Sequence, residues 1–574
     1  MATKSKMDRR QFLRASGAVG GLAVGAGAIA QSSNPLGNPS DLAFAEKLVG
    51  ANYTEAERAA IYEGLEGMVE RTRQRRAEVA IHNEDAPALT FDPRLPGESY
   101  HAQENYVRLE GEPARTLPSD QDIAFASIAD QGAWLRSGAL TANRLLDIYL
   151  NRIREYGPKR ECFITGMEES ARVEAFRADS ELRSGQDRGP LHGIPYGMKD
   201  LADTAGVKTS WGAAPYQNRV PTEDAVIVKR LREAGAVLVG KTSLGALAYG
   251  DKWFGGITRN PWNTDEGSSG SSAGSASATA AGLVGFSIGT ETLGSIVSPS
   301  MRCGTTGLRP TFGRVPRTGA MALCWSLDKF GPICRHVDDT ALVLAAINGY
   351  DAGDPSSVDW GFEYDAAATA ASDITIGYDP AWFSGENVNA LDQSVFDQVR
   401  ELGFPMKEIS LPDMPYGTLI TLLEVEAAAA FEELTLSNRD DEMGWQENRA
   451  WPNTFRGAHF YSAVEAVQLD RFRRKVMQAM HDIYKEVDII LCPSFGPLLT
   501  ITNYTGHPCL VLPTGMENRE SVPLTGEPLP AERAVKSVPR GFTLWGNMFR
   551  EDQILAVGKL LERQINFGSN RPTL

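Results

Sequence analysis

The chain has little of what several common kinds of site require. Among 574 residues there are only seven histidines and six cysteines, and no two cysteines have the C-x-x-C spacing of a metal site. Neither a metal nor an organic cofactor is therefore expected. The cysteines are expected to be ordinary buried or free thiols; they are Cys162, Cys303, Cys324, Cys334, Cys492 and Cys509.

Positive charge is also scarce. The formal net charge is −16 and the pI is near 5.1, which argues against nucleic acid as the main partner, because phosphate binding requires clustered Lys and Arg. Hydrophobic residues make up 42% and charged residues 23%, as in a globular protein that is soluble. Beyond residue 30 no apolar stretch is long enough to span a bilayer, so no stable membrane anchor is expected.

The first thirty residues differ from the rest. Arg9 and Arg10 precede Phe12-Leu13, an apolar stretch rich in Ala and Gly follows, and Ala28-Ile29-Ala30 has the small-x-small pattern of a cleavage site. This resembles a twin-arginine signal peptide over residues 1–30. We therefore expect transient contact with the twin-arginine export machinery, cleavage near Ala30 and a periplasmic or extracellular location.

Two further regions follow. Residues 31–119 are predicted to be a partly helical N-terminal extension, in which Thr54 and Glu57 form a capping box for a helix that runs to about residue 80. Residues 120–574 have an α/β pattern, typical of a sheet with helices on both faces. Helices are predicted at 139–156, 168–182 and 223–234 (N-cap Thr222), and strands at 236–240, 283–288, 374–378 and 487–491.

Three residues lie in contexts that suggest nucleophilic catalysis. Ser295 follows Leu293-Gly294 after a predicted strand, at a place where unpaired backbone N–H groups are expected. A serine needs a base, and His192 is the one candidate among the histidines, although we expect it to be a structural hydrogen-bonder. Lys199, in an apolar segment bent by Pro and Gly, can serve instead if burial keeps it neutral. Residues 263–275, with Ser271, suggest a flexible linker, but the small-residue helix predicted at 276–282 favours tight packing.

These motifs resemble those of the amidase signature family over about residues 120–565. The likeness rests on several segments in the family's order, which are Asn260-Pro261-Trp262, Ser269-Gly270-Ser271-Ser272-Ala273-Gly274-Ser275, Gly289-Thr290-Glu291-Thr292-Leu293-Gly294-Ser295, Cys303-Gly304, Gly307-Leu308-Arg309-Pro310-Thr311 and Asn503-Tyr504-Thr505-Gly506-His507-Pro508.

The resemblance implies a fold and a set of roles. The fold would be a large, twisted, mixed central β-sheet flanked by helices on both faces. Ser295 would be the acylated nucleophile, Lys199 the base, and Ser271, after a cis peptide bond, the proton relay. Backbone N–H groups of Thr292, Leu293, Gly294 and Ser295 would form the oxyanion hole, with Ser272 as a supporting hydrogen-bonder or a plain helix N-cap.

Three positions depart from the family pattern. Glu291 replaces the usual Asp, and Val297 stands where an Arg is frequent, so the ion pair between those positions is expected to be absent. Leu293 replaces a glycine. Because leucine avoids positive φ, we expect a negative φ at Leu293 and a side chain that narrows the acyl side of the cleft.

The expected function is hydrolysis of the C–N bond of a small-molecule carboxylic amide. Two alternatives stay open: a glutaminase subunit of a tRNA-dependent amidotransferase, and a catalytically inactive secreted binding protein. The sequence does not identify the natural amide. It does not fix the oligomeric state either, and a homodimer is one option. Aromatic residues of 410–470 can line a pocket or fill the core; they are Trp445, Trp451, Phe455, His459, Phe460 and Tyr461.

Overall fold

The computed structural model describes residues 37–574 except 112, 114–115, 368–370, 385–387 and 529–531. The signal peptide expected at 1–30 lies outside the described residues. The chain divides into two compact units at Ala80/Ile81. Among the described residues, none of the helices combines the length and apolar character needed to cross a bilayer.

From residue 37 onward, the first unit contains three helical segments: η1 (Pro39–Asp41), α2 (Leu42–Val49) and α3 (Glu55–Glu78). The predicted capping box is confirmed, since Thr54 N–H donates to Glu57 Oε2 at 2.7 Å and Glu57 N–H donates to Thr54 Oγ1 at 3.3 Å. The start of α3 is further tied to α2 by an ion pair of 2.6 Å between Arg58 and Glu46.

The second unit is built on an eleven-stranded mixed sheet. Parallel pairs join β3 to β4 and β9, and β13 to β14 and β15, while the other neighbours are antiparallel. In spatial order the strands are β14 (Met406–Glu408), β13 (Ile376–Tyr378), β15 (Ile489–Cys492), β17 (Val535–Gly546), β16 (Cys509–Glu520), β10 (Thr306–Arg309), β11 (Lys329–Cys334), β9 (Phe286–Glu291), β3 (Pro195–Lys199), β4 (Val237–Thr242) and β2 (Phe163–Gly166).

Among the residues that the structure describes, three small strand pairs lie outside this sheet. They are β1 (Tyr106–Arg108) with β12 (Glu363–Asp365), β5 (Lys252–Trp253) with β6 (Gly256–Ile257), and β7 (Arg259–Asn260) with β8 (Asn263–Gly267).

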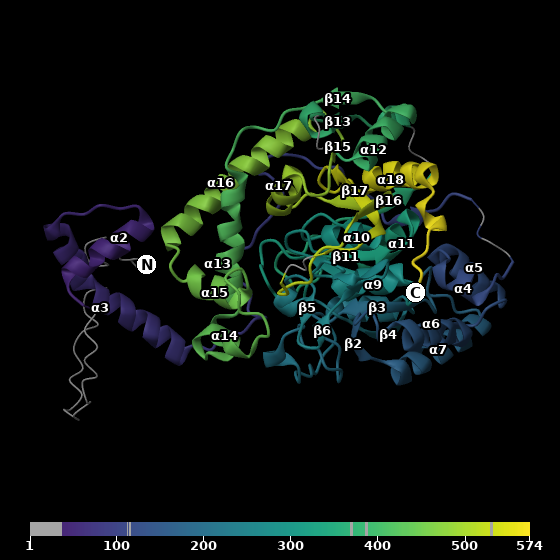
Figure 1. The fold of residues 1–574 in the computed structure, drawn as a ribbon, viewed down its shortest axis with the longest axis horizontal. Helices are drawn as coiled ribbons and strands as arrows, with labels where there is room; N and C mark the ends of the chain where they lie inside the picture. Colours follow the sequence, from purple (N-terminus) through teal and green to yellow (C-terminus); the bar gives the residue numbers. More distant parts are fainter. Residues whose placement is uncertain (1–36, 112, 114–115, 368–370, 385–387, 529–531) are drawn as a thin grey trace, which may run out of the picture. The chain divides into compact units, whose positions relative to one another are not determined.

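Helices flank the central sheet, as Figure 1 shows. The α-helices of this unit are α4 (Asp120–Phe125), α5 (Ile128–Ser137), α6 (Ala142–Tyr156), α7 (Glu168–Arg183), α8 (Val226–Glu233), α9 (Ala273–Ala280), α10 (Val297–Cys303), α11 (Val337–Ile347), α12 (Ala390–Glu401), α13 (Ile420–Ala430), α14 (Glu432–Leu436), α15 (Trp451–Ala458), α16 (Ala463–Tyr484), α17 (Pro497–Thr505) and α18 (Glu551–Ile565). Short 3₁₀ turns are η2 (Ala214–Tyr216), η3 (Ala246–Ala248), η4 (Ala371–Asp373), η5 (Pro380–Phe383), η6 (Tyr416–Leu419), η7 (Arg439–Glu442) and η8 (Phe567–Ser569).

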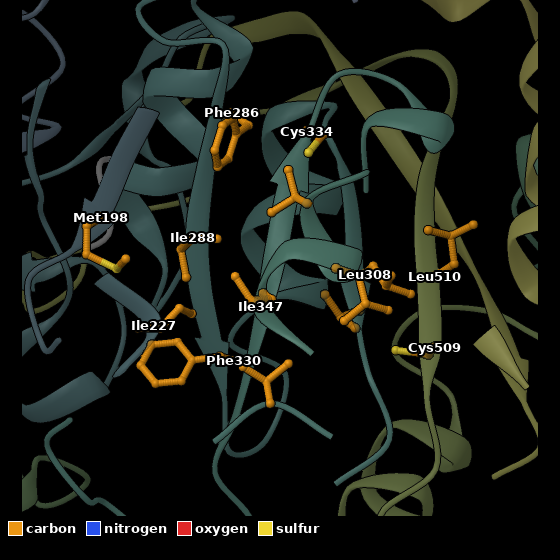
Figure 2. Packing of buried hydrophobic residues seen from close by; sticks show 14 of the residues in the cluster. Met198, Ile227, Phe286, Ile288, Leu308, Phe330, Cys334, Ile347, Cys509 and Leu510 are labelled. Carbon is orange, nitrogen blue, oxygen red and sulfur yellow. The ribbon is translucent and has the colours of Figure 1, made fainter. Parts of the chain in front are cut away.

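The core lies along the middle of this sheet (Figure 2). Side chains from β3, β9, β10, β11 and β16 pack with those of α8 and α11, and the labelled ones are buried. The six cysteines are free and buried, as expected. This core holds the ends of β3 and β9, and hence the predicted site residues, on a rigid support.

Most predicted elements are confirmed with shifted ends, but the N-cap at Thr222 is wrong. Helix α8 begins at Val226, and its cap Ala225 makes no side-chain hydrogen bond. Other segments satisfy the first backbone donors instead, because Ala225 N–H donates to Asp203 C=O at 2.8 Å and Val226 N–H to Thr318 C=O at 3.0 Å. A capping side chain is therefore not needed here.

Candidate active site

Lys199 is the last residue of β3 and is fully buried. Its Nζ lies 2.9 Å from Ser271 Oγ, 3.0 Å from Ser272 Oγ and 2.8 Å from Thr290 Oγ1. The carbonyl oxygen of Thr290 is a further neighbour at 3.4 Å. The structure thus brings Lys199 and Ser271, which are 72 residues apart, into direct contact.

The surroundings of Lys199 disfavour its charge. Burial lowers the pKa of Lys199 well below its ordinary value, and the more distant Asp328 and Glu291 only partly oppose this effect. No carboxylate of the described residues forms an ion pair with Lys199. A lysine held in this way loses its proton more readily than an ordinary lysine.

Ser271 and Ser272 lie at the start of α9, after the cis Gly270–Ser271 peptide bond that the resemblance implies. Ser272 Oγ does not cap the helix. Instead Ser272 Oγ donates to Thr290 C=O and accepts from Thr290 N–H, both at 3.0 Å. The serine loop is thereby fastened to the end of β9, beside the Lys199 amine.

Ser295 lies in the loop that joins β9 to α10, as predicted. Its side chain is mostly buried but lines a cavity, and its C=O accepts from Ser272 N–H at 3.1 Å. This contact places the loop of Ser295 beside the loop that carries Ser271. In the described part of the chain, the Ser295 hydroxyl makes no hydrogen bond to another side chain, so its oxygen is open to the cavity.

Glu291 organises the Ser295 loop. Its carboxylate accepts from the N–H groups of Ile296 and Val297 at 2.8 and 2.9 Å, and it pairs with Arg309 at 2.6 Å. Burial would raise the pKa of Glu291, but Arg309, the Val297 N–H and Asn503 outweigh it and lower the pKa. An ion pair to residue 297 is absent, as expected, yet Arg309 supplies a buried partner that the sequence patterns did not indicate.

The backbone donors of this loop are open. No described residue accepts a hydrogen bond from the N–H groups of Leu293, Gly294 or Ser295. Gly294 has a φ of +86°, in the left-handed region that suits glycine, whereas Leu293 is not among the residues with positive φ, as predicted. Adjacent unpaired N–H groups next to a serine can stabilise an oxyanion.

A cavity of about 560 Å³ opens onto these groups. Its wall includes Gly270, Thr292, Leu293, Gly294 and Ser295. Of the aromatic residues predicted to line a pocket or fill the core, only Trp451 lines this cavity, and its indole N–H donates to Leu247 C=O at 2.9 Å. The others lie elsewhere: Phe455 is in the core, Trp445 packs on Tyr249, and His459, Phe460 and Tyr461 are exposed.

His192 is not part of this site. Its ring is buried, its Nε2 lies 3.0 Å from Glu181, and its Nδ1 accepts from Arg188 N–H at 3.1 Å. Burial lowers the pKa of His192, against the effect of Glu181 and Asp187. These contacts fit the structural role that we expected.

Three residues near the site escaped sequence reasoning. Thr290 holds both Lys199 and Ser272, Asp328 accepts from Thr292 Oγ1 at 2.6 Å, and Arg309 balances Glu291. Thr290 and Arg309 lie inside motifs already noted, so only their roles were missed. Asp328 lies outside those motifs and gave no signal. Among the described residues, no cluster of His, Cys, Asp and Glu is arranged to hold a metal.

The chain belongs to the amidase family, whose model matches residues 144–555. Among curated relatives, a glutamyl-tRNA(Gln) amidotransferase subunit from Roseiflexus sp. (strain RS-1) is 31% identical over 481 residues, which cover 78% of this chain and 98% of that protein.

Solved structures are similar too. A peptide amidase from Stenotrophomonas maltophilia has a TM-score of 0.65 and 28% identity, over 78% of this chain and 98% of that one. A protein of a vestigial complex that bears on the origins of an s-triazine catabolic enzyme has a TM-score of 0.68 and 26% identity, over 78% of this chain and 100% of that one. The expected amidase signature fold is thus confirmed.

Proposed function

We propose that the protein hydrolyses the C–N bond of a carboxylic amide through an acyl-enzyme on Ser295. The observation that carries this proposal is the buried Lys199, whose amine contacts Ser271 at 2.9 Å beside the open N–H groups of the Ser295 loop. Family membership supports the same reaction.

One arrangement of the hydrogen bonds around Lys199 leaves its lone pair facing Ser271. The Ser272 hydroxyl donates its hydrogen bond to Thr290 C=O, so it can only accept a hydrogen bond from Lys199. A neutral amine that donates its two N–H bonds to Ser272 Oγ and Thr290 Oγ1 keeps its lone pair for the Ser271 hydroxyl. This is the orientation that a base needs.

The reaction then follows in balanced steps. Ser295 Oγ attacks the amide carbon while its proton passes to Ser271, and the Ser271 proton passes to Lys199. The N–H groups of residues 293–295 stabilise the oxyanion. Reversal of the proton path protonates the leaving nitrogen as the C–N bond breaks. Water, activated by the same relay, then releases the carboxylic acid and restores Ser295.

A panel of aliphatic, aromatic and peptide amides tests the proposal on the purified protein, with release of acid and amine measured together. We expect hydrolysis of at least one class and no turnover by Ser295→Ala. A panel without turnover, or a Ser295→Ala variant with parental activity, contradicts the proposal. Lack of reaction of Ser295 with a fluorophosphonate would favour an inactive binding protein.

A second candidate is a glutaminase subunit of a tRNA-dependent amidotransferase. The observation that favours it is the 31% identity with the amidotransferase subunits of two Roseiflexus strains. An assay of glutamine hydrolysis with and without charged tRNA separates the two. We expect no dependence on tRNA; stimulation by charged tRNA would favour the amidotransferase instead.

We also propose that residues 1–30 direct export through the twin-arginine pathway, with cleavage near Ala30. The support is the Arg9-Arg10 pair ahead of an apolar, Gly-rich stretch. Mass spectrometry of the periplasmic fraction should find an N-terminus near Gln31. The double variant Arg9→Lys/Arg10→Lys should stay in the cytoplasm with its first thirty residues attached. Wild-type chains found only with intact Met1 contradict export.

A further inference from the structure

A second cavity, of about 350 Å³, adjoins the Ser295 cavity. We call it the inner chamber. Ala248, Thr292 and Leu323 line both cavities, and Thr290, which contacts Lys199, lines the inner chamber. Because the two cavities share these residues, a substrate bound at Ser295 would lie next to the inner chamber.

Charged groups in the wall of the inner chamber already have partners. Arg317 pairs with Asp354 at 2.9 Å, and Glu426 accepts from Ser326 N–H at 2.9 Å. Asp328 accepts from Thr292 Oγ1 and from the N–H groups of Leu323 and Cys324.

Two further ionisable residues, Lys329 and Glu84, line it. Lys329 donates to Leu327 C=O, and burial lowers the pKa of Lys329 to about 7, while Glu84 is exposed to solvent. An anionic substrate group would therefore lose its hydration in the interior beside the carboxylates of Asp328 and Glu426.

The rest of the wall is largely apolar. It includes aliphatic and aromatic residues from three separate segments of the chain: Pro87, Leu89, Leu201, Met321, Trp325 and Phe330. A cavity of this size and lining suits an aromatic ring or a branched alkyl group, because most of such a group's surface would be buried against carbon.

One wall comes from residues 83–91, which precede the part of the chain that the family model matches. Two anchors hold this segment. The Asn83 amide donates to Ala322 C=O and accepts from Ala322 N–H, both at 2.8 Å. At the other end, Phe91 packs edge-on against Phe312 with ring centroids 5.0 Å apart.

Leu89, one of the residues that line the chamber, lies between these anchors with 93% of its surface exposed. An apolar side chain of the wall is thus left uncovered by the protein itself. A bound apolar group can cover it, and this contact would be stabilising.

We propose that the inner chamber binds a bulky apolar group of the amide substrate and that residues 83–91 form a specificity-determining wall of it. This inference rests on the proposed function. It assigns substrate choice partly to a segment that lies outside the family's common region, so the preferences of relatives need not apply.

The test compares Leu89→Asp with Val173→Asp, a matched change at a residue of α7 that is 70% exposed and lines neither cavity. The probes are acetamide, phenylacetamide and N-benzylacetamide, so the phenyl group is placed on either side of the scissile bond. We expect Leu89→Asp to lower kcat/KM roughly tenfold for one of the phenyl substrates, mainly through KM, and to leave acetamide unchanged. Val173→Asp should match the parent on all three.

A second variant, Met321→Ala, enlarges the chamber and should shift the preference toward a naphthyl analogue of the favoured substrate. The inference is overturned if amides are hydrolysed but both chamber variants keep the parental profile, or if Leu89→Asp lowers activity on acetamide and the phenyl substrates equally. If the parent hydrolyses no amide at all, the proposed function itself fails, and a direct binding measurement with phenylacetamide and the Leu89→Asp variant then decides on the chamber.

Discussion

Two fully buried lysines on neighbouring strands have very different surroundings. Lys241 on β4 pairs in register with Met198, next to Lys199 at the end of β3. The Nζ of Lys241 lies 2.6 Å from Ala202 C=O, 2.9 Å from Thr209 Oγ1 and 3.4 Å from Asp200 Oδ1. Lys199, in contrast, contacts three hydroxyl groups and one carbonyl but no carboxylate.

The difference shows that burial alone does not make a base. Burial lowers the pKa of both lysines, but Asp200 opposes this effect at Lys241 by direct contact. Lys241 can therefore remain part of a buried ion pair that holds the loop after β3. Lys199 has neighbours that suit an uncharged amine, one of which is the Ser271 hydroxyl. We assign a structural role to Lys241 and the catalytic one to Lys199.

The largest expected effect separates these two roles. Lys199→Met should lower kcat by several orders of magnitude and leave the free energy of unfolding nearly unchanged, because it removes the base without leaving a buried charge. Lys241→Met should instead destabilise the fold by about 3–5 kcal/mol, since Asp200 then loses its partner. Urea unfolding and steady-state kinetics on both variants measure the contrast. Equal losses of kcat in the two variants would contradict the assignment of different roles to the two lysines.

The next effect concerns pH. Because only the neutral form of Lys199 accepts a proton, kcat/KM should rise about tenfold per pH unit below the apparent pKa of the relay, and should then hold a plateau into mildly alkaline pH. Because the pKa of Lys199 is lowered, this plateau should begin at a lower pH than it would with an ordinary lysine as the base. A profile that is already flat at pH 5 would be incompatible with a lysine base.

A third buried lysine extends the comparison to stability. Burial lowers the pKa of Lys329 to about 7, so between about pH 7 and 10.5 the unfolded chain holds a proton there that the folded chain does not. The free energy of unfolding should therefore rise with pH across this window.

Lys329→Met should remove this contribution. The variant should be more stable than the parent at pH 7, by a few kcal/mol at most, and the difference should shrink toward pH 10. Thermal unfolding at several pH values measures it. A difference that stays constant from pH 7 to 10 would show that Lys329 is charged in the folded protein.

The smallest expected effect is at Leu293, whose side chain lines the Ser295 cavity. Leu293→Gly should keep the reactivity of Ser295 and admit bulkier acyl groups. It should cost about 1 kcal/mol of stability, because glycine adds freedom to the unfolded chain. An acyl-size series and urea unfolding check both points; an unchanged size profile would show that Leu293 does not narrow the acyl side.

Local sequence patterns predicted the helices and strands that carry the site residues better than they predicted the polar contacts around those residues. Alternating helices and strands, with the Gly/Ser segments at their ends, indicated where Lys199, Ser271 and Ser295 lie. Contacts between distant segments were not readable: Asp328 reaches Thr292 across 36 residues, and Asn83 reaches Ala322 across 239. The N-cap at Thr222 failed for the same reason, since tertiary contacts replaced the local one.

The most direct test of the account is the reaction of a fluorophosphonate with the protein across a range of pH. Mass spectrometry of the digested adduct locates the modified residue, and the labelling rate reports the state of the base. We predict a single adduct on Ser295, with a rate that rises to a plateau as Lys199 becomes neutral and that collapses in Lys199→Met but not in Lys241→Met. An adduct on another residue, or a rate in Lys199→Met equal to that of the parent, would contradict it.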